Sequence, residues 1–319
     1  DIETVVLDHG FSSPLTDHTG EPFRLIEQAV METFPGVKTS PYVMTGASDS
    51  RFLSRVCDNC IRFAPIYING QQYGSIHALN EKRVEVFYQP IFSVKEKKFT
   101  SAEALVRIRD EKGELVSPAE FIEVAEAKGL IIRLGEEVFR LVCKFIKENK
   151  LTEYGIEYVE INLSMIQCAY ENLATEFIQI MKEYEIDPKT IVLEITESAS
   201  IYEKKVLLQN MKALMNEGVR FALDDFGTGY SSLNHIREMP IDVIKIDRCF
   251  VEHVGEDDFS DAFVRMVAEL ASSIGVTVCV EGVENKSQLE MIREMKIRLL
   301  QGYLFGRPMK IEDFEKKYL

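Results

Sequence analysis

The fold is decided by residues 191–226, which read IVLEITESASIYEKKVLLQNMKALMNEGVRFALDDF. Two short apolar runs, IVLEITE (191–197) and RFALDDF (220–226), flank a longer stretch whose apolar residues recur at helical spacing over 203–217. A strand, a helix and a second strand in this order predict a parallel β-α-β unit. Both runs carry carboxylates at or near their ends, although buried parallel strands are apolar by default.

The same alternation extends in both directions from this unit. Strand-like runs occur at VEVFYQPIF (84–92), SAEALVRI (101–108), YVEINLS (158–164), IVLEITE (191–197), RFALDDF (220–226), VIKID (243–247), TVCVEGV (277–283) and RLLQGYLF (298–305). Helix-like stretches lie at 118–128, 135–149, 171–184, 203–217, 259–274 and 286–295. This alternation predicts an α/β protein with a closed (β/α)₈ barrel of the TIM type. An open doubly wound sheet is the alternative, but the Gly-rich turn that favours it is absent after the first strand.

The composition and the periodicity of the sequence change near residue 80. Residues 1–80 are rich in turn-forming residues, and helical periodicity there is confined to about 21–34. Beyond this segment the regular alternation of strands and helices begins. We therefore predict a small α+β segment over residues 1–81 and a barrel over residues 82–319.

Composition excludes several classes of protein. The chain has 319 residues, of which 46% are hydrophobic and 28% are charged, a globular and not a disordered balance. The net charge of −15 disfavours binding of a DNA or RNA duplex, and an anionic substrate would need a local cation. No run of about 18 uncharged apolar residues occurs, so no membrane segment is expected. Scattered cysteines and the lack of a secretion leader predict a cytoplasmic protein.

Polar residues gather where the predicted strands end. In barrels of this type the active site lies at the carboxyl ends of the strands. A buried carboxylate costs several kcal/mol unless it is paired or bound to a metal. A cluster over six consecutive strands therefore predicts a functional site rather than packing. Its members are Glu103, Asn162, Glu194, Glu197, Asp224, Asp225, Lys245, Asp247, Glu281 and Glu284.

These residue types indicate phosphodiester chemistry with divalent cations. Carboxylates and an asparagine offer the oxygen ligands that suit Mg²⁺ or Mn²⁺. The adjacent Asp224 and Asp225 would bridge two such ions, an arrangement used for phosphodiester hydrolysis. Lys245 would orient the attacking water or a phosphate oxygen. The alternative for Lys245 is a structural ion pair with Asp247 or another carboxylate.

Two further features have both a functional and a structural interpretation. The stretch DDFGTGYSSL (224–233) carries two glycines directly after a strand. It is either a loop that closes over substrate or an ordinary turn before a helix capped by Ser231 or Ser232. Cys57 and Cys60 form a CxxC pair, but a structural zinc site needs a second ligand pair, which the sequence lacks.

Nine short motifs occur in order along residues 84–319. They are YQPI (88–91), EALVR (103–107), PAEFI (118–122), INLS (161–164), LEITE (193–197), DDFGTGYSSL (224–233), IKID (244–247), VEGVE (280–284) and QGYLFGRP (301–308). Through them this part of the chain resembles EAL-type cyclic di-GMP phosphodiesterases over essentially the whole domain. The resemblance implies a barrel whose first strand runs antiparallel to the others. One departure is VEGVE where AEGVE is commoner, a change in packing.

The resemblance assigns roles to matching residues. The metal-binding positions fall on Glu103, Asn162, Glu194, Asp224, Asp225 and Glu281. The catalytic positions fall on Lys245, which would contact the catalytic water, and on Glu103 and Glu281, the latter a general base in some accounts. Positions that hold the dinucleotide fall on Gln89, Leu105, Arg107 and Gln301. Glu197 falls on the residue that anchors the loop after Asp225, and Glu284 on a further acidic position near the site.

The implied activity is hydrolysis of cyclic di-GMP to linear pGpG with two Mg²⁺ or Mn²⁺ ions. The alternative is a receptor that binds cyclic di-GMP and signals without turnover. No GGDEF-like motif is present, so a cyclase is not expected. The resemblance also implies a homodimer formed through the barrel. These expectations place the protein in bacterial second-messenger signalling.

Residues 1–81 resemble a different family. The segments SPYVMTGASDSRF (40–52), CDNCIRFAPIYI (57–68) and IHALNE (76–81) are similar to the C-terminal end of zinc aminoacylase/carboxypeptidase-type metallopeptidases. His77 would fall on that family's last metal ligand. The His-x-Asp motif of the family is missing from the chain, so we expect this segment to be non-catalytic. It is a natural fusion, an artefact or a regulatory cap.

Overall fold

The computed structural model describes residues 21–33, 84–110, 112–196, 204–228 and 239–319. The chain divides into two units, Asp1–Tyr73 and Gly74–Leu319, and each is considered by itself. In the first unit the described part is helix α1 (Glu21–Thr33), at the place of the helix predicted over 21–34. Within it Gln28 Nε2 donates to Glu32 Oε1, one turn further on, at 2.8 Å.

The second unit contains the strands of the predicted barrel. They are β1 (Val84–Ser93), β2 (Lys98–Arg109), β4 (Tyr158–Leu163), β5 (Ile191–Thr196), β6 (Arg220–Phe226), β7 (Val243–Ile246), β8 (Thr277–Val280) and β9 (Leu299–Leu300). A two-residue strand, β3 (Leu115–Val116), extends β2 as a short hairpin outside this set. All eight predicted runs are therefore strands.

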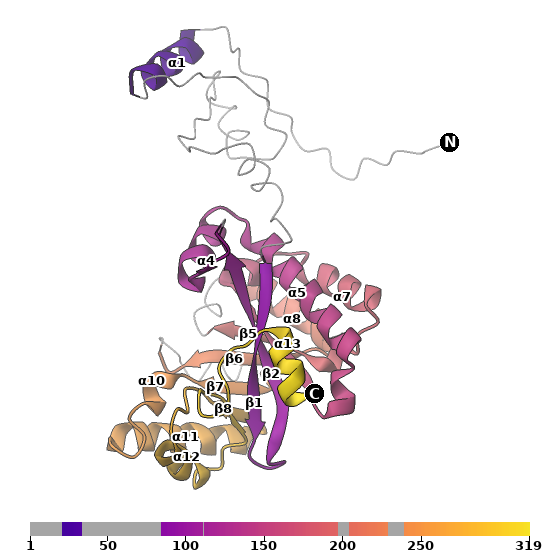
Figure 1. Cartoon of the computed structure of the whole chain (residues 1–319), viewed down its shortest axis with the longest axis vertical. Helices are drawn as coiled ribbons and strands as arrows, with labels where there is room; N and C mark the ends of the chain where they lie inside the picture. Colours follow the sequence, from indigo (N-terminus) through magenta and orange to yellow (C-terminus); the bar gives the residue numbers. More distant parts are fainter. Residues whose placement is uncertain (1–20, 34–83, 111, 197–203, 229–238) are drawn as a thin grey trace. The chain divides into compact units, whose positions relative to one another are not determined.

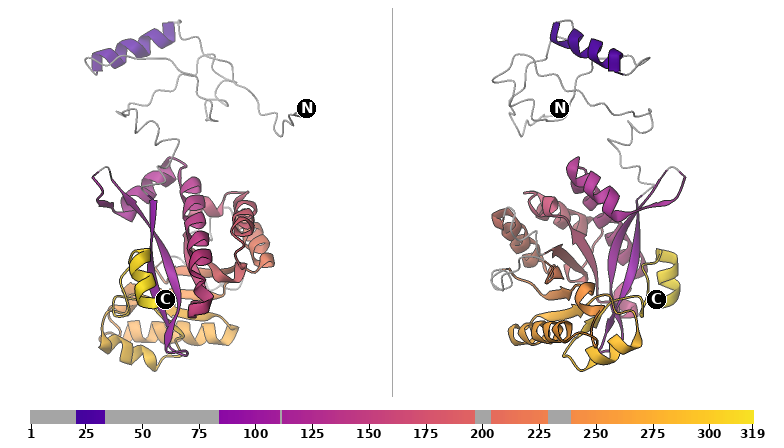
Figure 2. Two further views of the ribbon diagram at one scale, coloured as in Figure 1. Left: turned by 45° about the vertical axis from the view of Figure 1, so that its right-hand side comes forward. Right: turned by 90° about the vertical axis from the view of Figure 1, so that its left-hand side faces the viewer.

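Pairing of β1 with both β2 and β9 closes the sheet into a barrel. Hydrogen bonding runs in the order β1-β9-β8-β7-β6-β5-β4-β2, and β1 returns to β2 over its whole length. The strand β1 is antiparallel to both of its neighbours, whereas β2 and β4 to β9 are parallel to one another. Figure 2 shows β1 and β2 side by side as a long ribbon. The closure confirms the (β/α)₈ barrel with an antiparallel first strand and excludes the open sheet.

Helices cover the outside of the barrel (Figure 1). They are α4 (Pro118–Ala127), α5 (Ile131–Asn149), α6 (Met165–Cys168), α7 (Leu173–Glu183), α8 (Lys204–Glu217), α10 (Arg248–Val251), α11 (Asp258–Ile274), α12 (Lys286–Arg293) and α13 (Ile311–Tyr318), with 3₁₀ turns at Leu151–Tyr154 and Pro188–Thr190. Stacked rings of Phe139 and Phe177, 3.9 Å between centroids, join α5 to α7. In the described part of the chain no helix has the length and apolar character to cross a membrane.

Alternation along each strand separates an outer core from a barrel interior. In β5, Ile191, Leu193 and Ile195 belong to the large core shared with the helices, whereas Val192 belongs to a second cluster inside the barrel. Side chains of a strand point alternately to its two faces, so Glu194 also faces inward. The interior apolar layer consists of Ile91, Tyr158, Val192, Ala222, Val243, Cys279 and Leu299.

The last predicted strand is shorter than its sequence suggests. The run 298–305 forms a strand only at Leu299–Leu300, after which the chain turns away. Gly302 permits this turn, because its φ is +154° and a Cβ there would lie 2.2 Å from the carbonyl oxygen of Val283. Any other residue would clash with this backbone. The turn leaves Gln301 at the end of β9, where it faces the polar site.

Candidate active site

Strand register brings the polar residues of neighbouring strands to one end of the barrel. Gln89 is paired with Glu103 across β1 and β2, and Glu103 is paired with Glu160 across β2 and β4. One level nearer the carboxyl end, Asn162 is paired with Glu194. Because aligned residues of adjacent strands point to the same face, these side chains line the same part of the interior. They lie above the apolar layer, on its carboxyl-end side.

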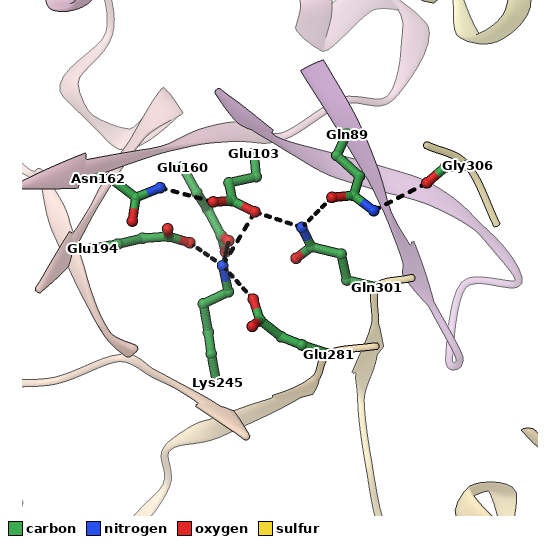
Figure 3. Close-up of polar contacts among 9 residues, drawn as sticks. All are labelled: Gln89, Glu103, Glu160, Asn162, Glu194, Lys245, Glu281, Gln301 and Gly306. Atoms are coloured by element: carbon green, nitrogen blue, oxygen red, sulfur yellow. Dashed lines mark hydrogen bonds and ion pairs between the residues drawn. The ribbon is translucent and has the colours of Figure 1, made fainter. Parts of the chain in front are cut away.

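Lys245 is the centre of this site (Figure 3). Its side chain is fully buried, and its Nζ lies 2.5 Å from Glu194 Oε1 and 2.7 Å from Glu281 Oε1. Glu160 Oε2 at 3.5 Å and Glu103 Oε2 at 3.6 Å complete a set of four carboxylates. The sequence-based alternative was an ion pair with Asp247 or another carboxylate, and the structure shows pairs with these other carboxylates. The Asp247 side chain instead accepts from the Cys249 amide and caps α10.

Side-chain amides connect the lysine cluster to β1. Gln301 Nε2 donates to Glu103 Oε2 at 2.5 Å and to Gln89 Oε1 at 3.3 Å. Gln89 Nε2 in turn donates to the carbonyl oxygen of Gly306 at 3.0 Å. On the other side, Asn162 Nδ2 donates to the second Glu103 oxygen at 2.7 Å. The chain of contacts fixes Glu103 in position and joins two predicted dinucleotide-binding residues to the lysine cluster (Figure 3).

Burial and electrostatic interactions shift the pKa values of the carboxyl groups and of Lys245. Burial raises the pKa of Glu194 well above its usual value and raises the pKa of Glu281 to about 8. Burial also acts to raise the pKa of Glu103, but Lys245 and the hydrogen bonds from Gln301 and Asn162 outweigh it and lower that pKa. Although burial disfavours its charged form, the surrounding carboxylates raise the pKa of Lys245. The lysine therefore stays charged and holds a cluster of carboxylates that repel one another.

The adjacent carboxylates Asp224 and Asp225 stand at the end of β6. Asp225 has a left-handed backbone with φ of +54°, an uncommon conformation for a residue other than glycine. The pairing of β6 with β7 shifts in register between Leu223 and Phe226, where this conformation occurs. Burial raises the pKa of Asp224 to about 6 and also raises the pKa of Asp225. Such backbone strain is common at ligand-binding sites, where it aims a side chain.

The donor set suits a hard divalent cation. Asp224 Oδ1, Glu194 Oε2 and Gln301 Oε1 are buried and have no hydrogen-bond partner within the described ranges. Buried oxygens of this kind normally have a partner, so their lack of one points to a missing cation or water. As the side chains lie, no group of three or more His, Cys, Asp or Glu residues in the described part of the chain is arranged to hold a metal. Two of the proposed ligands, Glu194 and Glu281, pair with the Lys245 ammonium.

The remaining predicted residues lie at different distances from this cluster. Arg107 is half-buried on β2, with its guanidinium 5.5 Å from the centroid of the Phe87 ring, and Leu105 is on the same strand. Glu284 is exposed, and its backbone amide donates to Gln288 Oε1 at 2.8 Å. Glu197 and residues 229–238 of the glycine-containing loop lie outside the described residues. Their predicted roles stay predictions.

One residue of the cluster was missed from the sequence. Glu160 on β4 is fully buried and lies 3.5 Å from Lys245. A signal was available, because Glu160 precedes Asn162 by two positions and must face the same side of the strand. The prediction for YVEINLS rests on Asn162 alone, although a carboxylate in the middle of a buried strand has the same desolvation cost as one at its end.

The raised carboxyl pKa values predict how the stability of the metal-free protein depends on pH. A carboxyl group whose folded pKa is raised stabilises the fold below its unfolded pKa, and this contribution is lost as pH rises through the folded pKa. Asp224 and Glu281, at about 6 and about 8, therefore weaken the fold across this window. We expect the free energy of unfolding in EDTA to fall by about 2–4 kcal/mol between about pH 5 and about pH 9.

Urea denaturation at both ends of this pH range measures the effect. The low pKa of Glu103 and the high pKa of Lys245 act outside the window and leave the sign unchanged. Glu281→Gln removes one of the two groups that titrate in this window and should flatten the pH dependence. Addition of Mn²⁺ should stabilise the protein more at the alkaline end. A metal-free stability that is constant or rises with pH would contradict the prediction.

Comparison with known proteins places this site in a family context. The family model described as EAL domain matches residues 76–308. The probable cyclic di-GMP phosphodiesterase PdeG of Escherichia coli is 33% identical over 241 residues, which are 75% of this chain and 47% of that protein. The cyclic di-GMP phosphodiesterase NbdA of Pseudomonas aeruginosa is 32% identical over 244 residues, 76% of this chain and 31% of that protein.

The solved structures agree with this similarity. A structure of the PaMucR phosphodiesterase in complex with c-di-GMP superposes with a TM-score of 0.71 at 30% identity, covering 76% of this chain and 99% of that one. The chain spans only 28%, 30% and 32% of three of the curated relatives it matches. The resemblance of residues 1–81 to a metallopeptidase has no support in these comparisons. His77, Cys57 and Cys60 lie outside the described residues.

Proposed function

Because this chain belongs to the EAL domain family of cyclic di-GMP phosphodiesterases, we propose that it hydrolyses cyclic di-GMP to linear pGpG in a metal-dependent reaction. The observation that carries the proposal is the fully buried Lys245, held by four carboxylates beside oxygens that lack a partner in the described structure. Four carboxylates around one ammonium leave an excess of buried negative charge, which a cation would compensate. An acidic site with unsatisfied oxygens has the chemistry required to bind cations, and the bound cations would in turn attract an anionic dinucleotide.

The proposed ligand residues are those at the open end of the barrel. Glu103, Asn162, Glu194, Asp224, Asp225 and Glu281 would hold two Mg²⁺ or Mn²⁺ ions. When bound, such ions neutralise phosphate charge and lower the pKa of a bound water. The oxygen donors without partners, among them Asp224 Oδ1 and Glu194 Oε2, support this assignment. The two bound cations would also supply the positive charge that a chain of net charge −15 otherwise lacks.

Lys245 and Glu281 would act on the attacking water. The side chain of Glu281 is 20% exposed, so it faces the open mouth, whereas Lys245 approaches from below and is fully buried. With cations bound, Glu281 would be ionised, and its carboxylate would accept a proton from the water. The Lys245 ammonium would donate to the water or to a phosphate oxygen and keep it in line for attack.

The substrate would be oriented by the residues around β1 and β2. Gln89 and Gln301 offer amide groups next to Glu103, and Gln301 Oε1 is a further buried acceptor without a partner among the described residues. Arg107 on β2 would attract a phosphate oxygen of the dinucleotide. The exposed Glu284 would add a further carboxylate near the mouth. The proposed homodimer and the regulatory role of residues 1–81 stay predictions.

Product analysis by chromatography tests the proposed function. The full chain is incubated with cyclic di-GMP and Mn²⁺ or Mg²⁺, and a parallel sample contains EDTA. We expect pGpG in the samples with metal and none with EDTA. Unchanged cyclic di-GMP together with tight binding in a titration would contradict hydrolysis and indicate a receptor that signals without turnover.

A further inference from the structure

Glu160 differs from the other carboxylates around Lys245 in its hydrogen-bond partners. It lies one level deeper in the barrel than Asn162, on the same strand and facing the same side. It is fully buried, and neither of its carboxylate oxygens has a hydrogen-bond partner in the part of the chain that the structure describes. The ammonium of Lys245, at 3.5 Å, is its paired charge (Figure 3).

The negative charge around Lys245 depends on which of the four carboxylates bind cations. Glu103, Glu194 and Glu281 are proposed cation ligands, and Glu160 is the fourth member of the set. When the three ligand carboxylates bind cations, the positive charge of the cations compensates the negative charge that these carboxylates otherwise present to Lys245. A fully buried ammonium then needs a counter-charge that does not take part in cation binding, because an unpaired buried charge is strongly unfavourable.

We propose that Glu160 is a positioning residue that holds the Lys245 ammonium, charged and in place, beneath the cation site during catalysis. This inference rests on the proposed function and adds a residue to it. The side chain of Glu160 is fully buried and ends 3.5 Å from the Lys245 ammonium. Carboxylates that orient a catalytic group from behind commonly change activity about 10- to 100-fold when they are replaced.

The test compares two substitutions that separate charge from shape. Glu160→Gln keeps the shape of the side chain and removes its charge, whereas Glu160→Asp keeps the charge and shortens the side chain. We expect Glu160→Gln to lower kcat about 10- to 100-fold with KM changed less than about threefold, and Glu160→Asp to recover part of the activity. Ser101→Ala, a buried change inside the barrel on β2, is the matched control and should leave both constants unchanged.

A double-mutant cycle shows whether Glu160 acts through Lys245. Combined with Lys245→Met, Glu160→Gln should change the residual rate less than about twofold, because the group that it positions is gone. An independent readout is the rise in Tm when Mn²⁺ is added, which should be smaller in Glu160→Gln than in the wild type. In the variant, the bound cations would face an ammonium without its counter-charge.

Several outcomes would overturn the inference. These are wild-type kcat in Glu160→Gln, equal losses with and without Lys245, or lower activity in Glu160→Asp than in Glu160→Gln, which would show that only shape matters. If the wild-type chain makes no pGpG, the proposed function fails by itself. The Mn²⁺-dependent Tm comparison then still decides the role of Glu160, since an equal rise in both proteins would exclude it.

Discussion

Replacing Asp224 by asparagine is expected to abolish hydrolysis, lowering kcat at least about a thousandfold, which corresponds to about 4 kcal/mol of transition-state stabilisation. Asp224 lies near the end of β6 beside Asp225, and its buried Oδ1 has no hydrogen-bond partner among the described residues. Asparagine keeps the shape but removes the charge that would bind a cation. Steady-state rates of pGpG formation at saturating Mn²⁺ measure the loss.

A matched substitution at the other end of the barrel controls for the change in side chain. Asp242 accepts a hydrogen bond from the Phe221 amide at 3.0 Å, and an asparagine there can still accept it. We expect Asp242→Asn to leave kcat within about twofold of the wild type. Retained turnover in Asp224→Asn at saturating metal would refute a catalytic role for the end of β6.

Lys245→Met is expected to reduce both turnover and stability. The substitution removes the proposed donor to the attacking water, so kcat should fall at least about a hundredfold while KM changes little. It also leaves four carboxylates without their ammonium, and breaking a buried pair in this way costs about 3–5 kcal/mol. Urea denaturation in EDTA near neutral pH measures the second effect.

The two effects respond differently to metal and to acid. Mn²⁺ should recover much of the stability of Lys245→Met but not its activity, because cations compensate the carboxylates without replacing the donor. Acid should also reduce the loss in stability, since protonated carboxyl groups no longer repel one another. The control is Lys182→Met on the exposed side of α7, expected to lie within about 0.5 kcal/mol of the wild type. A fully active or equally stable Lys245→Met protein would contradict the assignment.

Much of the barrel could be predicted because local pattern and overall fold agree. Each of the eight runs is a strand, and the helices between them begin and end within a few residues of their predicted limits. The run at 298–305 was the exception, since its end is set by the close approach of Gly302 to Val283. Such a contact joins distant residues, and no local periodicity records it.

In the site, too, local sequence predicts some features, whereas contacts between distant residues decide others. Carboxylates at strand ends were recognisable, because a parallel barrel brings all such ends to one mouth. Which carboxylates pair with Lys245 was not recognisable from the sequence. The sequence neighbour Asp247 caps a helix instead. Lys245 is bound instead by side chains from β2, β4, β5 and the end of β8, which register alone places around it.

By itself, the sequence determined the fold class, the family and the set of polar residues at the strand ends, because these follow from periodicity and from short motifs in order. Only the tertiary structure decided how that set is arranged. It placed Glu160 3.5 Å from the Lys245 ammonium, joined Gln89 to Glu103 through Gln301, and left Asp224 Oδ1 buried without a partner among the described residues. The physical reason is that charge pairing and desolvation depend on distances between strands, and barrel closure sets those distances.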